Sequence, residues 1–274
     1  MAFRKSLLLA FSLGITAAFL DCVSVEAAEP IRCTVIIDET SGEALYRQGA
    51  CDQGFYPQST FKLPLAMMGY DAGILTDAQN PRWKYQAKFG GPERVKKDVD
   101  PVVWEKDSIV WYSQEIARKL GKRKFTDYIQ SFGYGNRDVE GGPGKTDGLT
   151  ESWLMSSLKI SPDQQVQFIR RFLTDGLPIS DHAADMTLAI IPHFEAADGW
   201  DIQGKTGSGW LRDKAGKTDY SRPLGWFVGW AMKDERRVIF ARLLVDTKRQ
   251  GETPISFVVR DGLIRDFPKL AEGF

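Results

Sequence analysis

Histidine and cysteine, the residues on which many catalytic and metal sites depend, are scarce in this chain. Of 274 residues only two are histidine, His182 and His193, and three are cysteine. A Ser-His-Asp triad requires a histidine beside the nucleophile, and neither histidine lies in a recognisable motif. A zinc site requires three or four ligands. We therefore expect neither a histidine-dependent triad nor a metal site, and no G-x-G-x-x-G dinucleotide loop is present either.

An excess of charge of either sign is also missing. The chain has 36 basic and 36 acidic residues, so nothing favours nucleic acid or an anionic membrane surface as a partner. In contrast, 43% of the residues are hydrophobic and 12% are aromatic. A chain of this length and composition can bury a large core, which excludes disorder as its dominant state.

No apolar run is long enough to cross a membrane comfortably, but one near the start has the features of an export signal. Two basic residues precede an uncharged apolar run over residues 6–20, and small residues follow at Ala27 and Ala28. This order is typical of a secretory signal peptide. Cleavage after Ala27 fits best and cleavage after Ala28 is the alternative. We therefore expect a signal over 1–27, a single domain over 28–274 and a periplasmic location.

Cysteine usage agrees with export. Cys22 lies in the segment expected to be removed, and Asp21 before it is the wrong residue type for a lipoprotein signal. Cys33 and Cys51 then remain, an even number that flanks a predicted β-hairpin. In an oxidising compartment we expect such a pair to form a disulfide. The alternative is two buried free thiols.

Hydrophobic periodicity predicts an α+β fold, in which helices flank an antiparallel sheet and a mostly helical lobe is attached. Strands are expected at 33–38, 43–47, 201–211, 224–233 and 236–246, and helices from Ser59 to about Ala72, at 108–120, at 122–132, from Ser161 onward and at 253–267. The start at Ser161 is marked by a proline at the next position and a glutamine that completes a capping box. Residues 76–104 show few regular patterns.

The most informative stretch is Ser59-Thr60-Phe61-Lys62, at the start of an apolar helix. A spacing of three residues places the Ser59 hydroxyl and the Lys62 amine on one helical face, within contact of each other. A serine hydroxyl needs an adjacent base to become a good nucleophile. Lys62 can be that base, because burial among apolar side chains disfavours the ammonium form.

Two further motifs strengthen the hypothesis of a serine nucleophile. Lys205-Thr206-Gly207 lies in a predicted strand, where a cation, a hydroxyl and small glycines suit an extended substrate with a carboxylate. S-x-x-K, S-D-N and K-T-G together characterise penicillin-recognising serine enzymes. The middle motif is Ser108-Ile109-Val110 here, with aliphatic residues in place of the polar pair. Such a dry lining favours a neutral Lys62 amine, which can react with carbon dioxide to form an anionic carbamate, a stronger base.

Together these motifs resemble those of the class D β-lactamases, the oxacillinases. The matching stretches occur in the family order and span essentially all of the chain after the signal; they are residues 59–62, 108–110, 134–136, 153–158 and 205–207. The resemblance implies a β-lactamase/transpeptidase-like catalytic domain over 28–274. It also implies hydrolysis of β-lactam antibiotics through a serine acyl-enzyme, and resistance to them.

The resemblance further implies a role for each residue around the nucleophile. Ser59 would attack the β-lactam carbonyl, and Lys62, as N6-carboxylysine, would be the general base in acylation and deacylation. This carbamate comes from carbon dioxide or bicarbonate, and no cofactor or metal is implied. Trp153 would donate a hydrogen bond to it through its indole N–H, and Val110 would shield it from bulk water.

Other residues would handle the leaving group, the oxyanion and the pocket wall. Ser108 would relay a proton to the lactam nitrogen, tuned by the charge of Lys205. The backbone N–H groups of Ser59 and Ser208 would form the oxyanion hole. Tyr134 would shape the wall of the pocket.

The family also holds the substrate carboxylate with an arginine after the last strand. Arg249 and Arg260 are the candidates, because the loop that begins at Asp246 looks longer than usual, and we favour Arg260. The hydroxyls of Thr206 and Ser208 would share this contact.

Two other kinds of protein are alternatives. A penicillin-binding transpeptidase, or the sensor domain of a β-lactam receptor, would be acylated at Ser59 and then stall. A non-catalytic periplasmic binding protein would carry the motifs by accident. Val110 and residues 153–158 favour the hydrolase. As partners we expect a small-molecule β-lactam, no nucleic acid and no membrane after signal cleavage, with the protein a monomer or a weak dimer.

Overall fold

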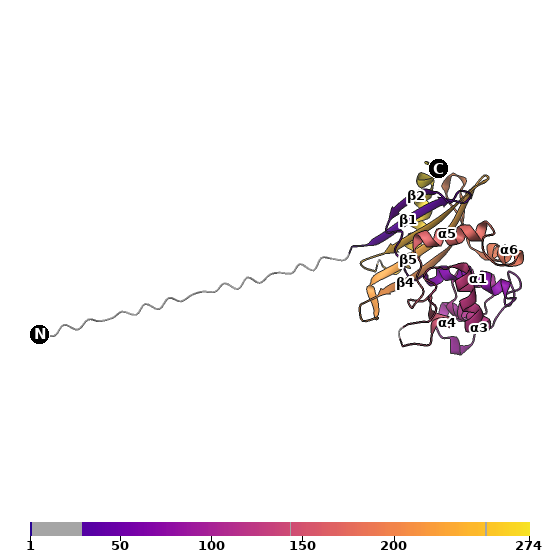
Figure 1. Cartoon of the computed structure of the whole chain (residues 1–274), viewed down its shortest axis with the longest axis horizontal. Helices are drawn as coiled ribbons and strands as arrows, with labels where there is room; N and C mark the ends of the chain where they lie inside the picture. The colour runs from indigo at the N-terminus through magenta and orange to yellow at the C-terminus, as the bar shows by residue number, and fades with distance from the viewer. Residues whose placement is uncertain (2–28, 143, 250) are drawn as a thin grey trace.

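A six-stranded antiparallel sheet forms the centre of the molecule, in the order β2-β1-β6-β5-β4-β3 (Figure 1). The computed structural model describes residue 1 and residues 29–142, 144–249 and 251–274. The strands are β1 (Ile31–Asp38), β2 (Ala44–Gly49), β3 (His193–Glu195), β4 (Asp201–Arg212), β5 (Thr218–Lys233) and β6 (Arg236–Val245). Because β3 pairs only with residues 201–203 of β4, the remaining length of β4 presents its outer edge to other elements.

The first hairpin is closed by a disulfide, as the sequence predicts. Strand β1 pairs with β2 so that Cys33 lies opposite Gly49, and Cys51 follows two residues later. The two cysteines are bonded, with their Cα atoms 5.1 Å apart, and both are buried. The bond ties the first strand to the segment that leads to Ser59.

One face of the sheet is covered by α7 (Ile255–Ala271), which packs against β4, β5 and β6. Val259, Leu263 and Phe267 recur every four residues and therefore form one helical stripe. All three are buried in a cluster with apolar side chains of the strands, among them Ile36 of β1. The neighbours of Ile36 in the sequence, Val35 and Ile37, belong to a separate cluster, as the alternation of strand side chains requires.

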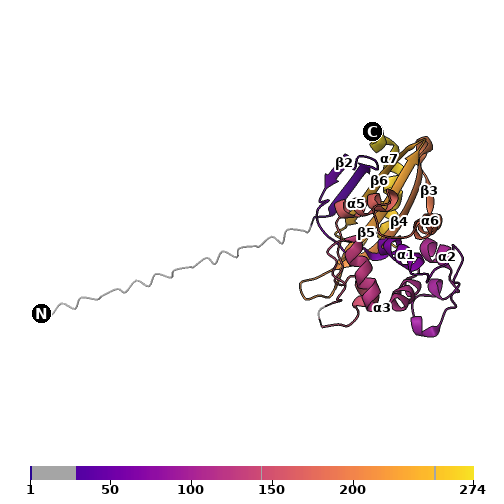
Figure 2. The same cartoon turned by 45° about the vertical axis from the view of Figure 1, so that its right-hand side comes forward.

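The opposite face carries α5 and a helical lobe (Figure 2). Helix α5 (Pro162–Leu173) starts with the predicted capping box, in which Ser161 and Gln164 hydrogen-bond reciprocally. The other helices are α1 (Lys62–Asp71), α2 (Pro101–Asp107), α3 (Val110–Phe132), α4 (Gly148–Glu151) and α6 (Asp181–Ile190), with 3-10 turns at η1 (Gln58–Phe61), η2 (Ala87–Phe89), η3 (Glu93–Val95) and η4 (Ala197–Gly199).

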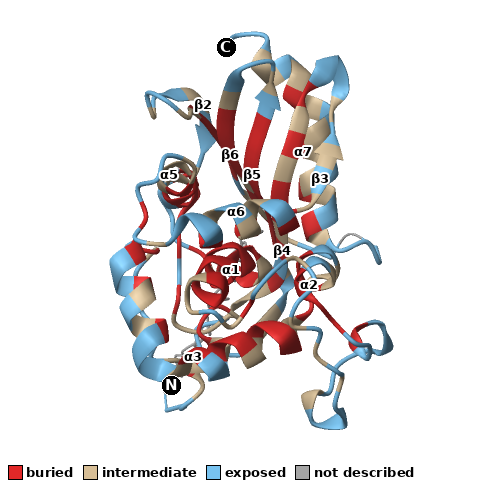
Figure 3. Ribbon diagram, turned by 90° about the vertical axis from the view of Figure 1, so that its right-hand side faces the viewer, coloured by how far each residue is buried: buried red, intermediate tan, exposed pale blue. Residues whose placement is uncertain are grey.

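Helix α1 lies deep inside the molecule (Figure 3), and every residue from Lys62 to Tyr70 is buried. A helix that is apolar on all sides is stable only when other elements enclose it. Here α3 and α6 pack against it. Lys62 is therefore buried in the core, because it is the first residue of this enclosed helix.

The α+β architecture is confirmed, with differences at particular elements. Helix α3 joins the two helices predicted at 108–120 and 122–132, and Gly121, the predicted stop, breaks it with a φ of 72°. Strand β5 begins at Thr218, six residues before the predicted start at 224. Helices α2 and α6 were not predicted.

The predicted signal peptide over 1–27 lies outside the described residues, apart from Met1. In the part of the chain that the structure describes, no helix is both long enough and apolar enough to cross a membrane.

Candidate active site

Ser59 lies on the 3-10 turn η1, which leads directly into α1. Gln58 before it has a φ of 53°, a left-handed conformation that costs a non-glycine residue about 1–3 kcal/mol. The backbone N–H of Gln58 donates to the carbonyl of Trp153 at 3.1 Å, which holds the turn in place. The residue before the predicted nucleophile is therefore strained and fixed at the same time.

Lys62 is the predicted base, and its amine lies 3.4 Å from the Ser59 hydroxyl. Its side chain is only 1% exposed. Burial lowers the pKa of Lys62 from 10.5 to about 7, and the positive charge of Lys205 adds to this lowering. At neutral pH a large fraction of the Lys62 amine is therefore uncharged, as a base or a carbamate precursor must be.

Ser108 and Lys205 are brought together from distant parts of the chain. Ser108 follows α2 in a left-handed conformation, with a φ of 56°. The Lys205 ammonium donates to Ser108 Oγ at 3.2 Å and to the backbone carbonyl of Thr206 at 3.3 Å. Strand β4 can approach the serine turn because Gly207 has no side chain: a Cβ there would lie 2.9 Å from the carbonyl oxygen of Pro57.

These groups border a pocket of about 590 Å³. Its lining includes residues from widely separated segments of the chain: Ser59, Arg94, Lys97, Lys106, Asp107, Ser108, Val110, Leu154, Thr206, Ser208, Ser256 and Phe257. The three basic side chains were not singled out from the sequence: Arg94 and Lys97 lie in residues 76–104, which show few regular patterns, and Lys106 lies in α2, which was not predicted. With one carboxylate against them, they give the pocket a positive character that suits an anionic substrate.

Ser256, at the start of α7, is a second pocket residue that the sequence did not reveal. Its hydroxyl accepts a hydrogen bond from Ser208 Oγ at 2.6 Å, and its backbone N–H donates to the same oxygen at 3.3 Å. Ser208 and Ser256 thus form a fixed hydroxyl pair beside Thr206. The sequence would have indicated Ser256 only if the start of α7 had been predicted to the exact residue, because its place in the first turn of the helix brings it next to β4.

The expectation that Arg260 lines the substrate pocket is not met. Arg260 lies four residues after Ser256 on α7, about 6 Å farther along the helix axis. Its guanidinium stacks on the Phe257 ring at 4.5 Å and pairs with Asp261. Arg249, the alternative, lines a smaller neighbouring cavity of about 250 Å³ that also includes Ser208. Among the described residues, neither arginine borders the pocket around Ser59.

Trp153 and Tyr134 both pack against Phe61, which lies between Ser59 and Lys62 in the sequence. Trp153 is buried and stacks on Phe61 with ring centroids 5.0 Å apart. Tyr134 meets the same ring edge-on at 5.5 Å and is 0% exposed. Because it is fully enclosed, Tyr134 supports the pocket from behind Phe61, so its expected part in shaping the wall is structural and not a direct contact with substrate.

Glu105 is a further residue that the sequence did not reveal. It is fully buried on α2, and its charge acts on both Lys62 and Lys205. A glutamate in an irregular, charged segment gives no sequence signal for burial, so only the fold identifies it.

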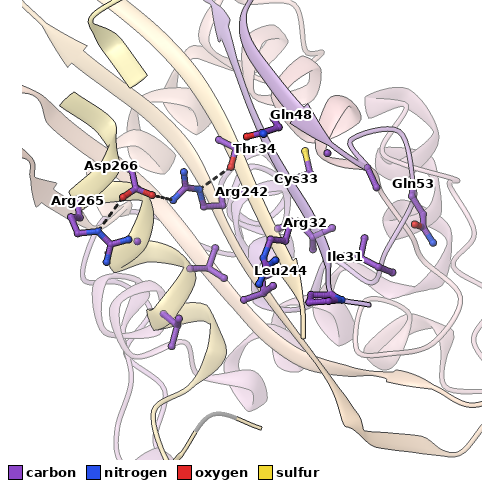
Figure 4. Close-up of a pocket in the computed structure, with 17 residues that line it drawn as sticks. Ile31, Arg32, Cys33, Thr34, Gln48, Gln53, Arg242, Leu244, Arg265 and Asp266 are labelled. Atoms are coloured by element: carbon purple, nitrogen blue, oxygen red, sulfur yellow. Dashed lines mark hydrogen bonds and ion pairs between the residues drawn. The ribbon is translucent and has the colours of Figure 1, made fainter. Parts of the chain in front are cut away.

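Another cavity, of about 800 Å³, lies between β1, β6 and α7 (Figure 4). It contains none of the motif residues. Arg242 in it already binds Thr34 and Asp266, at 2.9 Å each, and Arg265 also binds Asp266. Its larger volume therefore does not make it a candidate for the chemistry.

Residues 199–206 fit the letter pattern G-x-x-x-x-G-K-T of a phosphate-binding loop. Such a loop must wrap a phosphate and lead into a helix. Here residues 201–206 are extended within β4 and pair with β5, so the geometry excludes that function. In the described ranges, no group of three or more His, Cys, Asp or Glu side chains is placed to hold a metal ion.

Comparison with known proteins identifies the family to which the chain is similar. Residues 32–258 match the family of the penicillin binding protein transpeptidase domain. The matched range includes both the Ser59 turn and the Lys205-Thr206-Gly207 segment of β4.

Individual relatives narrow the class further. The chain is 46% identical over 270 residues to β-lactamase OXA-9 of Klebsiella pneumoniae, covering 97% of this chain and 98% of that one. It is 34% identical to β-lactamase OXA-1 of Escherichia coli, over 77% of this chain and 75% of that one. The crystal structure of the class D β-lactamase OXA-427 superposes with a TM-score of 0.80 at 38% identity, covering 87% and 97% of the two chains. The chain belongs to the class D β-lactamases.

Proposed function

We propose that this class D β-lactamase hydrolyses its substrates through an acyl-enzyme on Ser59, with Lys62 carboxylated on Nζ as the general base. The observation that carries the proposal is the buried Lys62 amine 3.4 Å from Ser59 Oγ. Carbon dioxide reacts with a neutral amine, and burial provides one by lowering the pKa of Lys62 to about 7.

The residues around Lys62 fit a carboxylated side chain. Val110 and Leu154 line the pocket beside Ser59 and limit the access of water. Trp153, packed on Phe61, is the proposed donor of a hydrogen bond to the added group through its indole N–H. When present, that group supplies an oxygen base for the Ser59 proton and later for a proton of the hydrolytic water.

The remaining residues act on the carbonyl and on the leaving nitrogen. Ser59 Oγ attacks the carbonyl carbon, and the backbone N–H groups of Ser59 and Ser208 stabilise the oxyanion. Ser108 gives its hydroxyl proton to the lactam nitrogen as the C–N bond breaks. The hydrogen bond from Lys205, at 3.2 Å, supports this role because a nearby cation stabilises a developing serine oxyanion.

The substrate carboxylate is proposed to bind at the hydroxyls of Thr206, Ser208 and Ser256. All three residues line the pocket, and the Ser208–Ser256 hydrogen bond of 2.6 Å fixes two of them. Arg94, Lys97 and Lys106 would contribute long-range attraction. Hydroxyls thus take the position at which an arginine was expected.

Turnover of nitrocefin tests this proposal against its alternatives. We expect sustained hydrolysis, abolished by Ser59→Ala and strongly reduced by Lys62→Ala. Turnover should fall below about pH 7, where Lys62 becomes ammonium, and added bicarbonate should restore part of it. A single stoichiometric burst in saturating bicarbonate would identify a transpeptidase or receptor domain instead.

Export to the periplasm and resistance to β-lactams complete the proposal. The Cys33–Cys51 disulfide supports export, since such bonds persist in oxidising compartments. Expression in a susceptible bacterium should raise the minimal inhibitory concentration of penicillins only if the exported protein is active. Removing residues 2–27 should abolish this protection without affecting the purified enzyme.

A further inference from the structure

Glu105 is a buried carboxylate that the proposed reaction does not use. It lies on α2, three residues before Ser108, and is 0% exposed. Neither of its carboxylate oxygens has a hydrogen-bond partner among the described residues. Burying an unpaired carboxylate is unfavourable, so its retention beside reactive groups points to a functional role.

The charges that act on Glu105 are those of the two active-site lysines. Burial raises the pKa of Glu105 to about 7, while Lys205 on β4 and Lys62 on α1 lower it. In return, Glu105 opposes the effect of burial on the pKa of each lysine. Burial raises the pKa of Tyr70 on α1, and the negative charge of Glu105 raises it further. Helix α6 also packs against α2, but among the described residues none of its charged side chains acts on the pKa of Glu105.

We propose that Glu105 is a positioning residue that limits carboxylation of Lys62, because its buried carboxylate, when ionised, competes with the added anionic group. The inference rests on the proposed function. Carboxylation forms a bond between Nζ and the carbon of carbon dioxide, moves one C=O electron pair onto oxygen and releases one Nζ proton to solvent. The amine must be neutral before the reaction, and the product is an anion.

A charged Glu105 opposes both requirements. It stabilises the ammonium form of Lys62, which cannot react, and it repels the anionic product across a buried, weakly screened space. Carboxylation of Lys62 is therefore accompanied by protonation of Glu105, which becomes harder as the pH rises. The protein should need more bicarbonate than a variant in which position 105 is neutral.

The test compares wild type with Glu105→Gln, which removes the charge and keeps the shape. Protein is titrated with 13C-labelled bicarbonate between pH 6 and pH 8, and the carbamate is followed by 13C NMR and by nitrocefin turnover. We expect the half-saturating bicarbonate concentration to fall about tenfold, equivalent to one pKa unit. The acid limb of the turnover profile should move about one pH unit lower.

Glu151→Gln is the matched control, because Glu151 is a half-buried carboxyl whose pKa is also raised by burial. The lysines of the site are not among the groups that act on it, and its titration should overlay that of wild type. Glu105→Met serves as a second variant and should show the same change as Glu105→Gln. If neither position-105 variant folds, Glu105 is structural and the inference is wrong.

Two further outcomes separate this inference from the proposed function. A carbamate signal in wild type, with an equal or higher bicarbonate requirement in Glu105→Gln, would overturn only the role of Glu105. No carbamate signal in either protein, at any pH, would overturn the carboxylated Lys62 and with it the competition proposed here.

Discussion

Replacing Lys62 with methionine should make the protein more stable and inactive at the same time. Methionine fills nearly the same volume as the aliphatic part of lysine but has no amine to desolvate. The Lys62 side chain is 1% exposed, and burial lowers its pKa from 10.5 to about 7. The substitution therefore removes the penalty of holding an amine in the core while leaving the packing of α1 intact.

The size of the effect follows from that pKa change. Each pKa unit corresponds to about 1.36 kcal/mol, so lowering the pKa from 10.5 to about 7 is a penalty of about 5 kcal/mol. Between pH 7 and pH 10.5 the unfolded chain binds more protons at this site than the folded chain. The penalty is therefore complete below about pH 7 and vanishes above about pH 10.5. For a protein of this size, about 5 kcal/mol corresponds to a rise in Tm of roughly 10–20 °C.

Thermal unfolding in buffers free of carbon dioxide, from pH 6 to pH 11, measures the difference between Lys62→Met and wild type. We expect the variant to have the higher Tm at pH 7, with the gap closing by pH 10.5. Nitrocefin turnover should fall by at least about 10²- to 10⁴-fold, the usual loss when a general base is removed. Lys124→Met, at an exposed position on α3, should change stability by less than about 0.5 kcal/mol at every pH. A Lys62→Met protein that is no more stable than wild type at pH 7 would refute the assignment of a desolvated amine.

Three other changes test separate parts of the structure. Replacing Cys33 and Cys51 together with serine should lower the unfolding free energy by about 3 kcal/mol, because the bond closes a loop across 18 residues; an unchanged calorimetric Tm would contradict this. Trp153→Phe keeps the ring and removes the indole N–H, so half-maximal turnover should need more bicarbonate; an unaltered bicarbonate titration would remove Trp153 from the site. Ser256→Ala should raise KM for penicillins several-fold, whereas Arg260→Ala should leave KM within about twofold; the opposite order would restore the arginine as the carboxylate ligand.

The sequence predicted those parts of the fold in which local pattern and tertiary packing agree. The capping box at Ser161 defines the start of α5, and the apolar run after Lys62 predicts a buried α1. Helix α2 was missed although Asp100 caps it through the Val103 N–H and a proline follows. Its seven residues are too few for periodicity to show, and most of the preceding segment lacks regular structure.

The structure brings the motif residues together as the sequence predicts, whereas the sequence missed pocket residues that only tertiary structure brings close. Ser59 and Lys62 are neighbours on one helix turn, so their contact follows from spacing. In contrast, Ser256 reaches the pocket only because the long connection after β6 ends where it does, and no periodic pattern fixes the length of that connection. Glu105 was missed because burial of a charged side chain contradicts the usual meaning of its residue type.

The two lysines of the site differ in their hydrogen-bond acceptors, and this difference favours Lys62 as the proposed site of carboxylation. Both are buried, and burial lowers the pKa of each. Lys205 donates to Ser108 Oγ and to a backbone carbonyl, so its ammonium form is partly compensated. Lys62 has one hydrogen bond among the described residues, to Ser59 Oγ at 3.4 Å, and it also faces the charge of Lys205. The two acceptors favour the ammonium form of Lys205, whereas the charge of Lys205 lowers the pKa of Lys62, which supports Lys62 as the amine proposed to react with carbon dioxide.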